Sequence, residues 1–348
     1  MKGKKTTVFP GNNSVSGFAS CYASGLAGME QVYIIKGGPG TGKSSFMRRL
    51  GEDFLNSGCD VEFWRCSSDT DSLDGVVIPA LSAAVIDGTA PHTMDPLYPG
   101  AKETILNFGD FWDEELLTKA KKDIISLTGR VSDAFSESYR HLAEAGACDD
   151  RLLAERKRRA EEFRVESFLA EVFGESSGTE RHLFAAAVTP EGIVDHTFDL
   201  CRGYQRRFFL QGKRGLGQQR CLEAVLEAGR RRRLTTDVFH GPFRKEEIRA
   251  VAFPDESVVV AAAENVPPKE LRESDRVLPF TAKSPSLRER QTEKDRDEAL
   301  AAAVAELAKA HMLHDDLEGF YVAAMDFDAL EELRERTRQK ILKRAAKA

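Results

Sequence analysis

The segment from Val32 to Met47 contains the residues of this chain with the clearest chemical meaning. After a short apolar run, Gly37 to Ser44 read Gly-Gly-Pro-Gly-Thr-Gly-Lys-Ser, which matches the spacing G-x-x-x-x-G-K-S. Glycines let the backbone turn so that successive N–H groups point inward, and a following helix adds the positive end of its dipole. Because Lys43 can reach phosphate oxygens and the Ser44 hydroxyl can bind magnesium, the pattern predicts a phosphate-binding loop.

Carboxylates that follow two apolar runs complete the predicted site. Residues 83–86 read as a buried strand ending in Asp87, the place typical of a Walker B aspartate that helps to hold Mg²⁺. Residues 61–66 read as another strand, and the acidic loop after it contains Asp69 and Asp71. Either aspartate would position an attacking water or accept its proton, although such residues also form turns.

The sequence therefore assigns three roles. The predicted catalytic residues are Lys43, Asp87, Asp69 and Asp71, and the predicted metal ligands are Ser44 and Asp87. The predicted nucleotide-binding residues are Gly37, Gly38, Pro39, Gly40, Thr41, Gly42, Lys43, Ser44 and Ser45. The expected cofactors are ATP and Mg²⁺; ATP is favoured over GTP because no [NT]-K-x-D guanine-binding stretch is evident.

The elements around these residues follow an α/β order. Residues 32–35 predict a buried strand before the loop, and residues 45–55 predict a helix after it, with Phe46, Leu50 and Phe54 on one face. Strands alternating with helices indicate a parallel sheet flanked by helices.

Three other segments shape the expected architecture. Residues 75–79 read as a short linker, whereas residues 89–112 contain three prolines and read as an irregular loop beside the site. His92, in that loop, is a candidate for contact with an acceptor group. Residues 112–173 are rich in charge and predict a long helical element with a break near Gly146.

The second half of the chain repeats the first at a constant offset of 175 residues. Residues 212–219 align with residues 37–44, and all three loop glycines coincide. The same offset aligns Phe9 with Phe184 without a gap. We therefore predict tandem duplicated P-loop NTPase domains with long helical appendages: residues 1–175 with an intact loop, and residues 176–348 as a degenerate repeat with C-terminal helices.

The chemistry of the loop is lost in the second copy. Lys43 is replaced by Gln218, Ser44 by Gln219 and Asp87 by Ala262. These changes remove the charge on the phosphates and the magnesium ligands, so the second copy is expected to be an α/β module without ligand. In the alternative, Arg206, Arg207 or Arg214 completes the first site as an arginine finger.

Composition sets the broader expectations. The chain has 348 residues, 41% hydrophobic and 30% charged, and a formal net charge of −6, which fits a globular protein of about two domains. Neither nucleic acid nor a membrane is an expected partner, since the charge is negative and no apolar run approaches ~20 residues. Six scattered cysteines, with no C-x-x-C pair, favour a cytoplasmic location.

Several motifs together resemble a family of bacterial tandem P-loop ATPase-like proteins. They are Phe9-Pro-Gly, the loop from Lys36 to Ser45, the segments Cys66 to Pro79 and Ile86 to His92, and Arg181 to Phe184 with Thr189 to Gly192. The resemblance covers nearly the whole chain and implies a P-loop NTPase fold and ATP binding. Many relatives are expected to have a usable loop in both halves, and Gln218 and Gln219 depart from that pattern.

Three functions are compatible with these residues. The first is a Mg²⁺-dependent ATPase with one active N-terminal loop. The second is a small-molecule or nucleotide kinase, in which residues 89–112 would cover an acceptor that His92 or Asp69 and Asp71 contact. The third is a non-enzymatic, nucleotide-gated scaffold or sensor, which would act on a protein partner. The sequence gives neither the acceptor nor the oligomeric state.

Overall fold

The computed structural model describes residues 2–90, 93–159, 178–282 and 284–346, and these form two compact units. Unit 1 comprises residues 1–11, 28–138 and 305–348, and unit 2 comprises residues 12–27 and 139–304. This division differs from the predicted halves 1–175 and 176–348, because each unit contains segments from both halves of the chain. The helical C-terminus, in particular, belongs to unit 1 with the intact loop.

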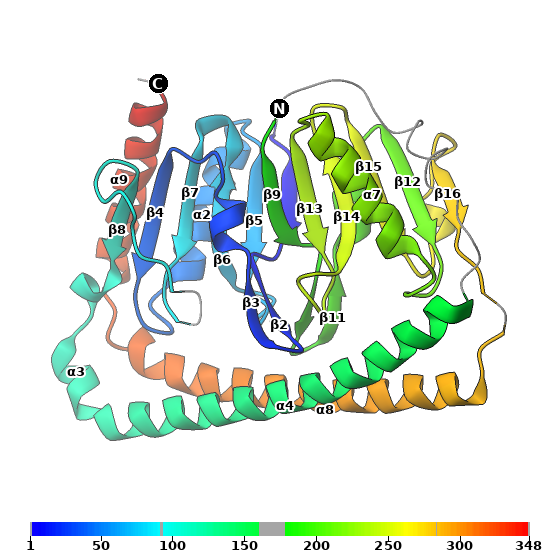
Figure 1. Ribbon diagram of the computed structural model, residues 1–348. Helices are drawn as coiled ribbons and strands as arrows, with labels where there is room; N and C mark the ends of the chain where they lie inside the picture. Colours follow the sequence, from blue (N-terminus) through cyan, green and yellow to red (C-terminus); the bar gives the residue numbers. More distant parts are fainter. Residues whose placement is uncertain (1, 91–92, 160–177, 283, 347–348) are drawn as a thin grey trace. The chain divides into compact units, whose positions relative to one another are not determined.

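A six-stranded mixed sheet forms the centre of unit 1. Its strands, in spatial order, are β1 (Lys5–Val8), β5 (Val61–Arg65), β6 (Leu73–Ile78), β7 (Ala83–Asp87), β4 (Gln31–Lys36) and β8 (Glu103–Asn107) (Figure 1). All pairs are parallel except those of β6, which runs antiparallel to both β5 and β7. The five parallel strands thus bring their carboxyl ends to one edge of the sheet.

Strand β6 corrects the predictions of a purely parallel sheet and of a linker at residues 75–79. Residues 73–78 are all buried, and short connections join β6 to its neighbours. Such connections suit antiparallel pairs, because a parallel pair needs a crossover of a dozen or more residues. The turn into β7 places Ser82 at a φ of 45°. Residues 103–107 are likewise a strand, within a segment predicted to be irregular.

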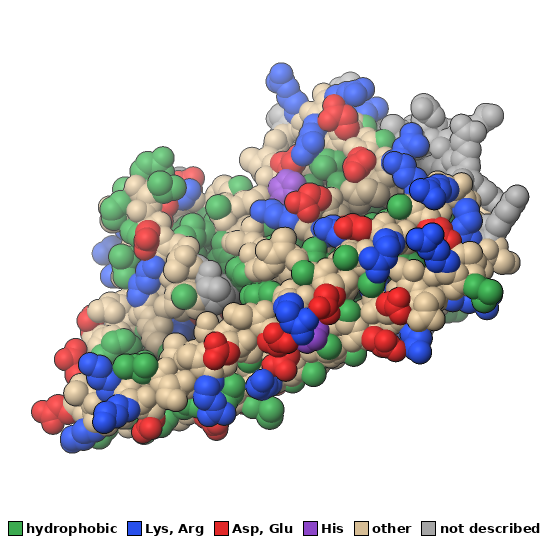
Figure 2. Space-filling model, turned by 60° about the horizontal axis from the view of Figure 1, so that its bottom comes forward, with side chains coloured by type: hydrophobic (Ala, Val, Ile, Leu, Met, Phe, Trp, Pro, Cys, Tyr) green, Lys and Arg blue, Asp and Glu red, His purple; other side chains and the backbone are tan. Residues whose placement is uncertain are grey.

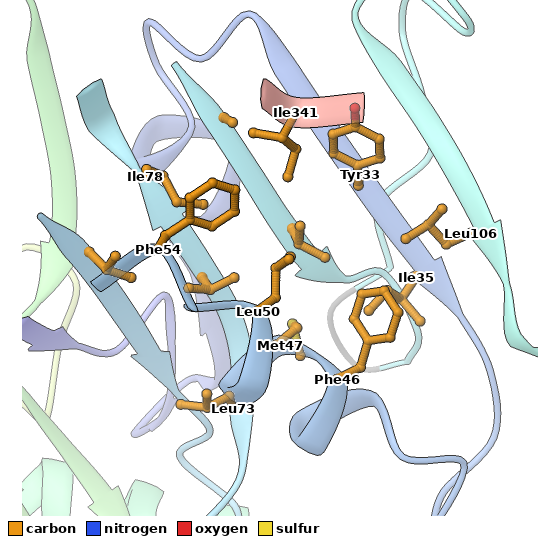
Figure 3. Close-up of a cluster of buried hydrophobic side chains, with 14 of the residues drawn as sticks. Tyr33, Ile35, Phe46, Met47, Leu50, Phe54, Leu73, Ile78, Leu106 and Ile341 are labelled. Atoms are coloured by element: carbon orange, nitrogen blue, oxygen red, sulfur yellow. The ribbon is translucent and has the colours of Figure 1, made fainter. Parts of the chain in front are cut away.

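Helix α2 (Lys43–Asn56) covers one face of this sheet. Phe46, Met47, Leu50 and Phe54 recur at helical spacing and pack on strand residues such as Ile35 (Figure 3). Helix α9 (Phe327–Ala345) contributes two further buried residues to the same cluster, Leu330 and Ile341. The far end of the chain therefore helps to build the core beneath the loop.

A second mixed sheet, with the same strand order, forms the centre of unit 2. Its strands are β16 (Arg276–Pro279), β12 (Arg206–Gln211), β15 (Val258–Ala263), β14 (Ile248–Phe253), β13 (Thr236–His240) and β9 (Glu180–Phe184), and helix α7 (Gln218–Arg231) packs on β14 (Figure 1). Register shifts fall between Trp64 and Arg65 in one sheet and between Phe239 and His240 in the other. These equivalences follow the offset of 175 residues seen in the sequence.

Short elements connect the sheets to the rest of the chain. Two hairpins pair β2 (Gly11–Ser14) with β3 (Gly17–Ser20) and β10 (Ala186–Thr189) with β11 (Gly192–Asp195). The short helices are α1 (Tyr22–Gly25), α3 (Glu114–Lys119) and α6 (Thr197–Cys201), with 3₁₀ turns η1 (Pro79–Leu81), η2 (Phe108–Phe111) and η3 (Pro268–Glu270).

The long helical appendages are present as α4 (Lys121–Arg159) and α8 (Leu287–Val322). Helix α4 passes through Gly146 without the predicted break; residues 160–173 of the predicted helical element lie outside the described residues. Figure 2 shows acidic and basic side chains interspersed on the face it presents, with neither sign gathered into one patch. Within the described ranges, no helix combines the length and apolar character needed to cross a membrane.

Candidate functional site

The glycine-rich loop lies between the carboxyl end of β4 and the first turn of α2. Gly40 and Gly42 have φ values of 64° and 81°, in the left-handed region that favours glycine. Gly42 is the N-cap residue of α2, so the loop leads directly into the N-terminus of the helix. The strand, loop and helix that the sequence predicts are therefore present at residues 31–56.

Lys43 lies against the loop and against Asp87. Its Nζ donates hydrogen bonds to the carbonyl oxygens of Gly38 (2.6 Å) and Gly37 (3.4 Å), and it lies 3.6 Å from Asp87 Oδ2. Only 13% of the Lys43 side chain and 10% of the Asp87 side chain are exposed. The register of β4 and β7 explains the meeting, since Asp87 lies opposite Ile35 at the edge from which the loop begins.

Ser44 and Asp87, the predicted magnesium ligands, both keep acceptor capacity. Ser44 Oγ accepts a hydrogen bond from the N–H of Leu73 at 3.0 Å, while Asp87 Oδ1 accepts from the N–H and the hydroxyl of Thr89. Among the described residues, no group of three or more His, Cys, Asp or Glu could hold a metal ion. A hydroxyl and a carboxylate next to the glycine-rich loop nevertheless fit Mg²⁺, which needs few protein ligands when a bound phosphate ligand and waters supply the others.

Asp69 and Asp71 lie in the loop that follows β5. Asp69 Oδ1 accepts a hydrogen bond from the N–H of Asp71 at 3.0 Å, which is the geometry of a turn-forming aspartate. Burial raises the pKa of the Asp69 carboxyl, and such a shift makes its carboxylate a stronger base. Asp71 is exposed and its backbone carbonyl accepts from Arg48, so Asp69 is the better placed of the two for proton transfer.

A cavity of about 680 Å³ unites these residues, and every residue that lines it belongs to unit 1. Of the predicted site residues, only Gly38 is not part of its lining, which includes Lys43, Ser44, Asp69, Asp71 and Asp87. The volume lies within the range typical of small-molecule sites.

One wall of the cavity was not predicted, and it comes from α8. It consists of Ala310, His311, His314, Glu318 and Val322. Glu318 Oε1 accepts a hydrogen bond from the N–H of Gly40 at 3.1 Å, and His314 Nε2 lies 3.5 Å from that oxygen. The spacing of 311, 314 and 318 places polar side chains on one helix face, which was the available sequence signal. Their link to a loop some 270 residues earlier was not readable from that spacing.

The predicted acceptor loop is only partly described. His92 lies outside the described residues. Among the described residues of this segment, Lys36 Nζ donates to the carbonyl oxygens of Gly88 and Met94, both at 2.8 Å, and lies 3.0 Å from Asp95 Oδ1. Lys36 therefore connects the backbone at Gly88 and at Met94 to the end of β4.

The corresponding loop of unit 2 keeps equivalent hydrogen bonds, with Gln218 and Gln219 in place of Lys43 and Ser44. Gln218 Nε2 donates to the carbonyl oxygens of Gly212 (2.9 Å) and Lys213 (3.1 Å), the equivalents of the two carbonyls that Lys43 contacts. Gln219 Oε1 accepts from the N–H of Ile248 at 3.1 Å, as Ser44 Oγ does from Leu73. The cavity beside this loop is smaller, about 300 Å³, and Ala262 lines it where unit 1 has Asp87.

The candidate arginine fingers are engaged within unit 2. Arg214 contacts both Asp149 (2.9 Å) and Glu247 (2.6 Å). Arg207 contacts Asp275 at 2.8 Å and is buried, and the Arg206 guanidinium lies 5.9 Å from the centre of the Phe208 ring. Carboxylates of unit 2 therefore already hold the guanidinium groups of Arg207 and Arg214.

Comparison with known proteins gave no match to a family model, a curated protein or a solved structure. The resemblance to tandem P-loop ATPase-like proteins therefore depends on the quoted motifs alone.

Proposed function

We propose that unit 1 is a P-loop nucleotide-binding unit and that the chain is a Mg²⁺-dependent ATPase with one active loop at residues 37–44. The observation that carries this proposal is the meeting of Lys43 and Asp87, 3.6 Å apart, beside the glycine-rich loop and the cavity. A lysine, a buried carboxylate and inward N–H donors at the start of a helix are the groups that bind phosphates together with a divalent cation.

In this proposal each side chain has a separate task. The loop N–H groups and Lys43 bind and neutralise the phosphates, and Ser44 and Asp87 would hold Mg²⁺, which adds positive charge where the transition state is most negative. Asp69 orients a water molecule. The oxygen of this water forms a bond to the γ-phosphorus while the bond from that phosphorus to the bridging oxygen breaks. ADP leaves with the electron pair of the broken bond, and a proton of the water passes to Asp69.

Lys43→Ala against Gln218→Ala tests the proposal, because the two residues make equivalent contacts with their own loops. With purified protein, ATP and Mg²⁺, Lys43→Ala should lower phosphate release by about 10²-fold or more. Gln218→Ala should leave the rate within about twofold, since the second loop has no lysine at the position of Lys43. Equal losses in the two variants, or phosphate release that ignores Lys43, would refute the one-site proposal.

The same assay separates the two alternatives that the sequence left open. A kinase would show ATP consumption that rises with an added acceptor, together with a phosphorylated product. A nucleotide-gated scaffold would bind ATP through Lys43 and turn over at the rate of the Lys43→Ala variant. Lys43-dependent phosphate release that no acceptor accelerates supports the ATPase.

A further inference from the structure

Glu318 occupies a donor of the phosphate loop. Its carboxylate oxygen Oε1 lies 3.1 Å from the N–H of Gly40, in the middle of residues 37–44. The N–H groups of such a loop are the donors that a phosphate oxygen would use. Lys43, the other phosphate ligand, is meanwhile bonded to loop carbonyls and paired with Asp87. Both groups are therefore satisfied by the protein itself.

Close packing holds Glu318 in this place. A Cβ atom on Gly40 would lie 2.6 Å from the backbone oxygen of Glu318, and one on Gly38 would lie 2.5 Å from the Tyr321 ring. One turn of α8 thus rests directly on two loop glycines, and that approach leaves no room for larger residues there. Glu318 also lines the cavity, so its side chain borders both the loop and the cavity.

The charges around Glu318 keep it anionic. The hydrogen bond from His314 lowers the pKa of the Glu318 carboxyl, and the Gly40 N–H and the Lys43 charge act in the same direction. A carboxylate and a phosphate oxygen carry the same sign and need the same N–H donor. They repel each other at contact distance, so they do not occupy the loop together.

The second copy supports a specific role for this carboxylate. In the helical parts the repeat follows an offset of 165 residues, which aligns Leu153 of α4 with Glu318. Leu153 packs on Gly215 as Glu318 packs on Gly40, with its Cδ2 3.0 Å from the place of a Cβ. A helix therefore contacts both loops at this glycine, whereas only the helix beside the loop with Lys43 places a carboxylate there, that of Glu318.

We propose that Glu318 is an internal competitor of phosphate: its carboxylate closes the loop at Gly40, and a nucleotide binds only as that carboxylate withdraws. The inference rests on the proposed nucleotide function of unit 1 and adds its regulation. Any partner or state that moves this turn of α8 would then set the nucleotide affinity of the loop.

Glu318→Gln tests the competition, because it removes the charge and keeps the size of the side chain. Calorimetric titration with Mg-ATP and, separately, with tripolyphosphate should show about tenfold tighter binding of both, since a charge-assisted hydrogen bond is replaced by a neutral one. Asp316→Asn is the matched control: it makes the same change at an exposed position of α8 and should bind as the unchanged chain does. Equal affinities of Glu318→Gln and the control would overturn the inference.

Two further variants keep the outcomes distinct. Glu318→Leu copies Leu153 and should also bind both ligands more tightly; it serves if Glu318→Gln folds poorly. A Glu318 variant with unchanged affinity and lost turnover would make Glu318 a catalytic residue instead, against the inference. Lys43→Ala tests the proposed function, which fails if the unchanged chain binds the ligands no more tightly than Lys43→Ala does. If binding depends on Lys43 but Glu318→Gln does not bind more tightly, only the proposed competition is overturned.

Discussion

The loops at residues 37–44 and 212–219 both have glycines with positive φ at two equivalent positions, but their side chains are very different. The φ values of Gly40 and Gly215 are 64° and 91°, and those of Gly42 and Gly217 are 81° and 114°. Lys43 and Gln218 even donate to equivalent carbonyl oxygens. A glutamine can thus preserve the hydrogen bonds of such a loop without its charge. Loop geometry alone is therefore weak evidence for phosphate chemistry, and the charged side chains decide.

The side chains beside the two loops also differ in how their charges are used. In unit 1 the neighbouring carboxylates of Asp69 and Asp87 line an open cavity with Lys43. In unit 2 the residue equivalent to Pro39 is Arg214, and its guanidinium lies between two carboxylates. Burial, which alone would lower the pKa of Arg214, is outweighed by Glu247 and Asp149, which raise it. Beside the second loop, the protein's own ion pairs thus stand where unit 1 has a cavity that could take a charged ligand.

Arg214→Ala should have the largest effect on stability, and it tests whether the second loop now stabilises unit 2 through its ion pairs. It leaves Asp149, whose side chain has no exposure, and Glu247 without their cation. Breaking a buried pair in this way costs about 3–5 kcal/mol of unfolding free energy. Urea unfolding followed by circular dichroism measures the loss.

Arg231→Ala is the control for that experiment. Arg231 pairs with Glu227 one helical turn away, and both side chains are mostly exposed, so the expected loss is about 0.5 kcal/mol or less. If both variants lost similar stability, the ion pairs of Arg214 would be no more than surface interactions, and the contrast between the two loops would weaken.

Asp87→Asn sharpens the contrast at the metal. Ala262 shows that the strand tolerates a residue without charge at this place, so folding should survive the change. We expect phosphate release to fall by about 10–10²-fold, with a smaller effect on ATP binding, because the proposed site would lose a carboxylate ligand of Mg²⁺. Initial rates measured against Mg²⁺ concentration test this.

Asp95→Asn provides the comparison, since Asp95 pairs with Lys36 and is largely exposed. Its rate should match that of the unchanged chain. An Asp87→Asn rate as high as that of Asp95→Asn would place the metal-binding carboxylate elsewhere in the cavity.

Local patterns predicted the part of the fold that local forces set. The apolar run before Gly37 and the helical spacing of Phe46, Leu50 and Phe54 correspond to β4 and α2. The direction of β6 was missed because a buried strand is apolar throughout, and such a run does not show which way it pairs. Glycine in a helix costs only ~1 kcal/mol, so Gly146 does not end α4.

The wall formed by α8 could not be predicted for a different reason. Residues 287–304 of this helix belong to unit 2 and residues 305–322 to unit 1, so no single apolar face runs along its whole length. His311, His314 and Glu318 are placed in the cavity by tertiary packing of residues 305–348 on unit 1. The spacing of these three polar side chains does not indicate that they line the cavity beside the loop at residues 37–44.

Ser44→Ala and Gln219→Ala together give the smallest expected stability effects and the finest comparison. Each side chain accepts a hydrogen bond from the first residues of the neighbouring antiparallel strand, Leu73 or Ile248. Removing either acceptor should lower the unfolding free energy by about 1 kcal/mol, measured by urea denaturation. Phosphate release should fall only in Ser44→Ala, because in the proposed site the Ser44 hydroxyl would bind magnesium whereas Gln219 would not. Gln219→Ser should gain no activity, since Gln218 and Ala262 still stand at the positions of the lysine and the aspartate of unit 1. A loss of turnover in Gln219→Ala as large as that in Ser44→Ala would mean that both loops act in the reaction.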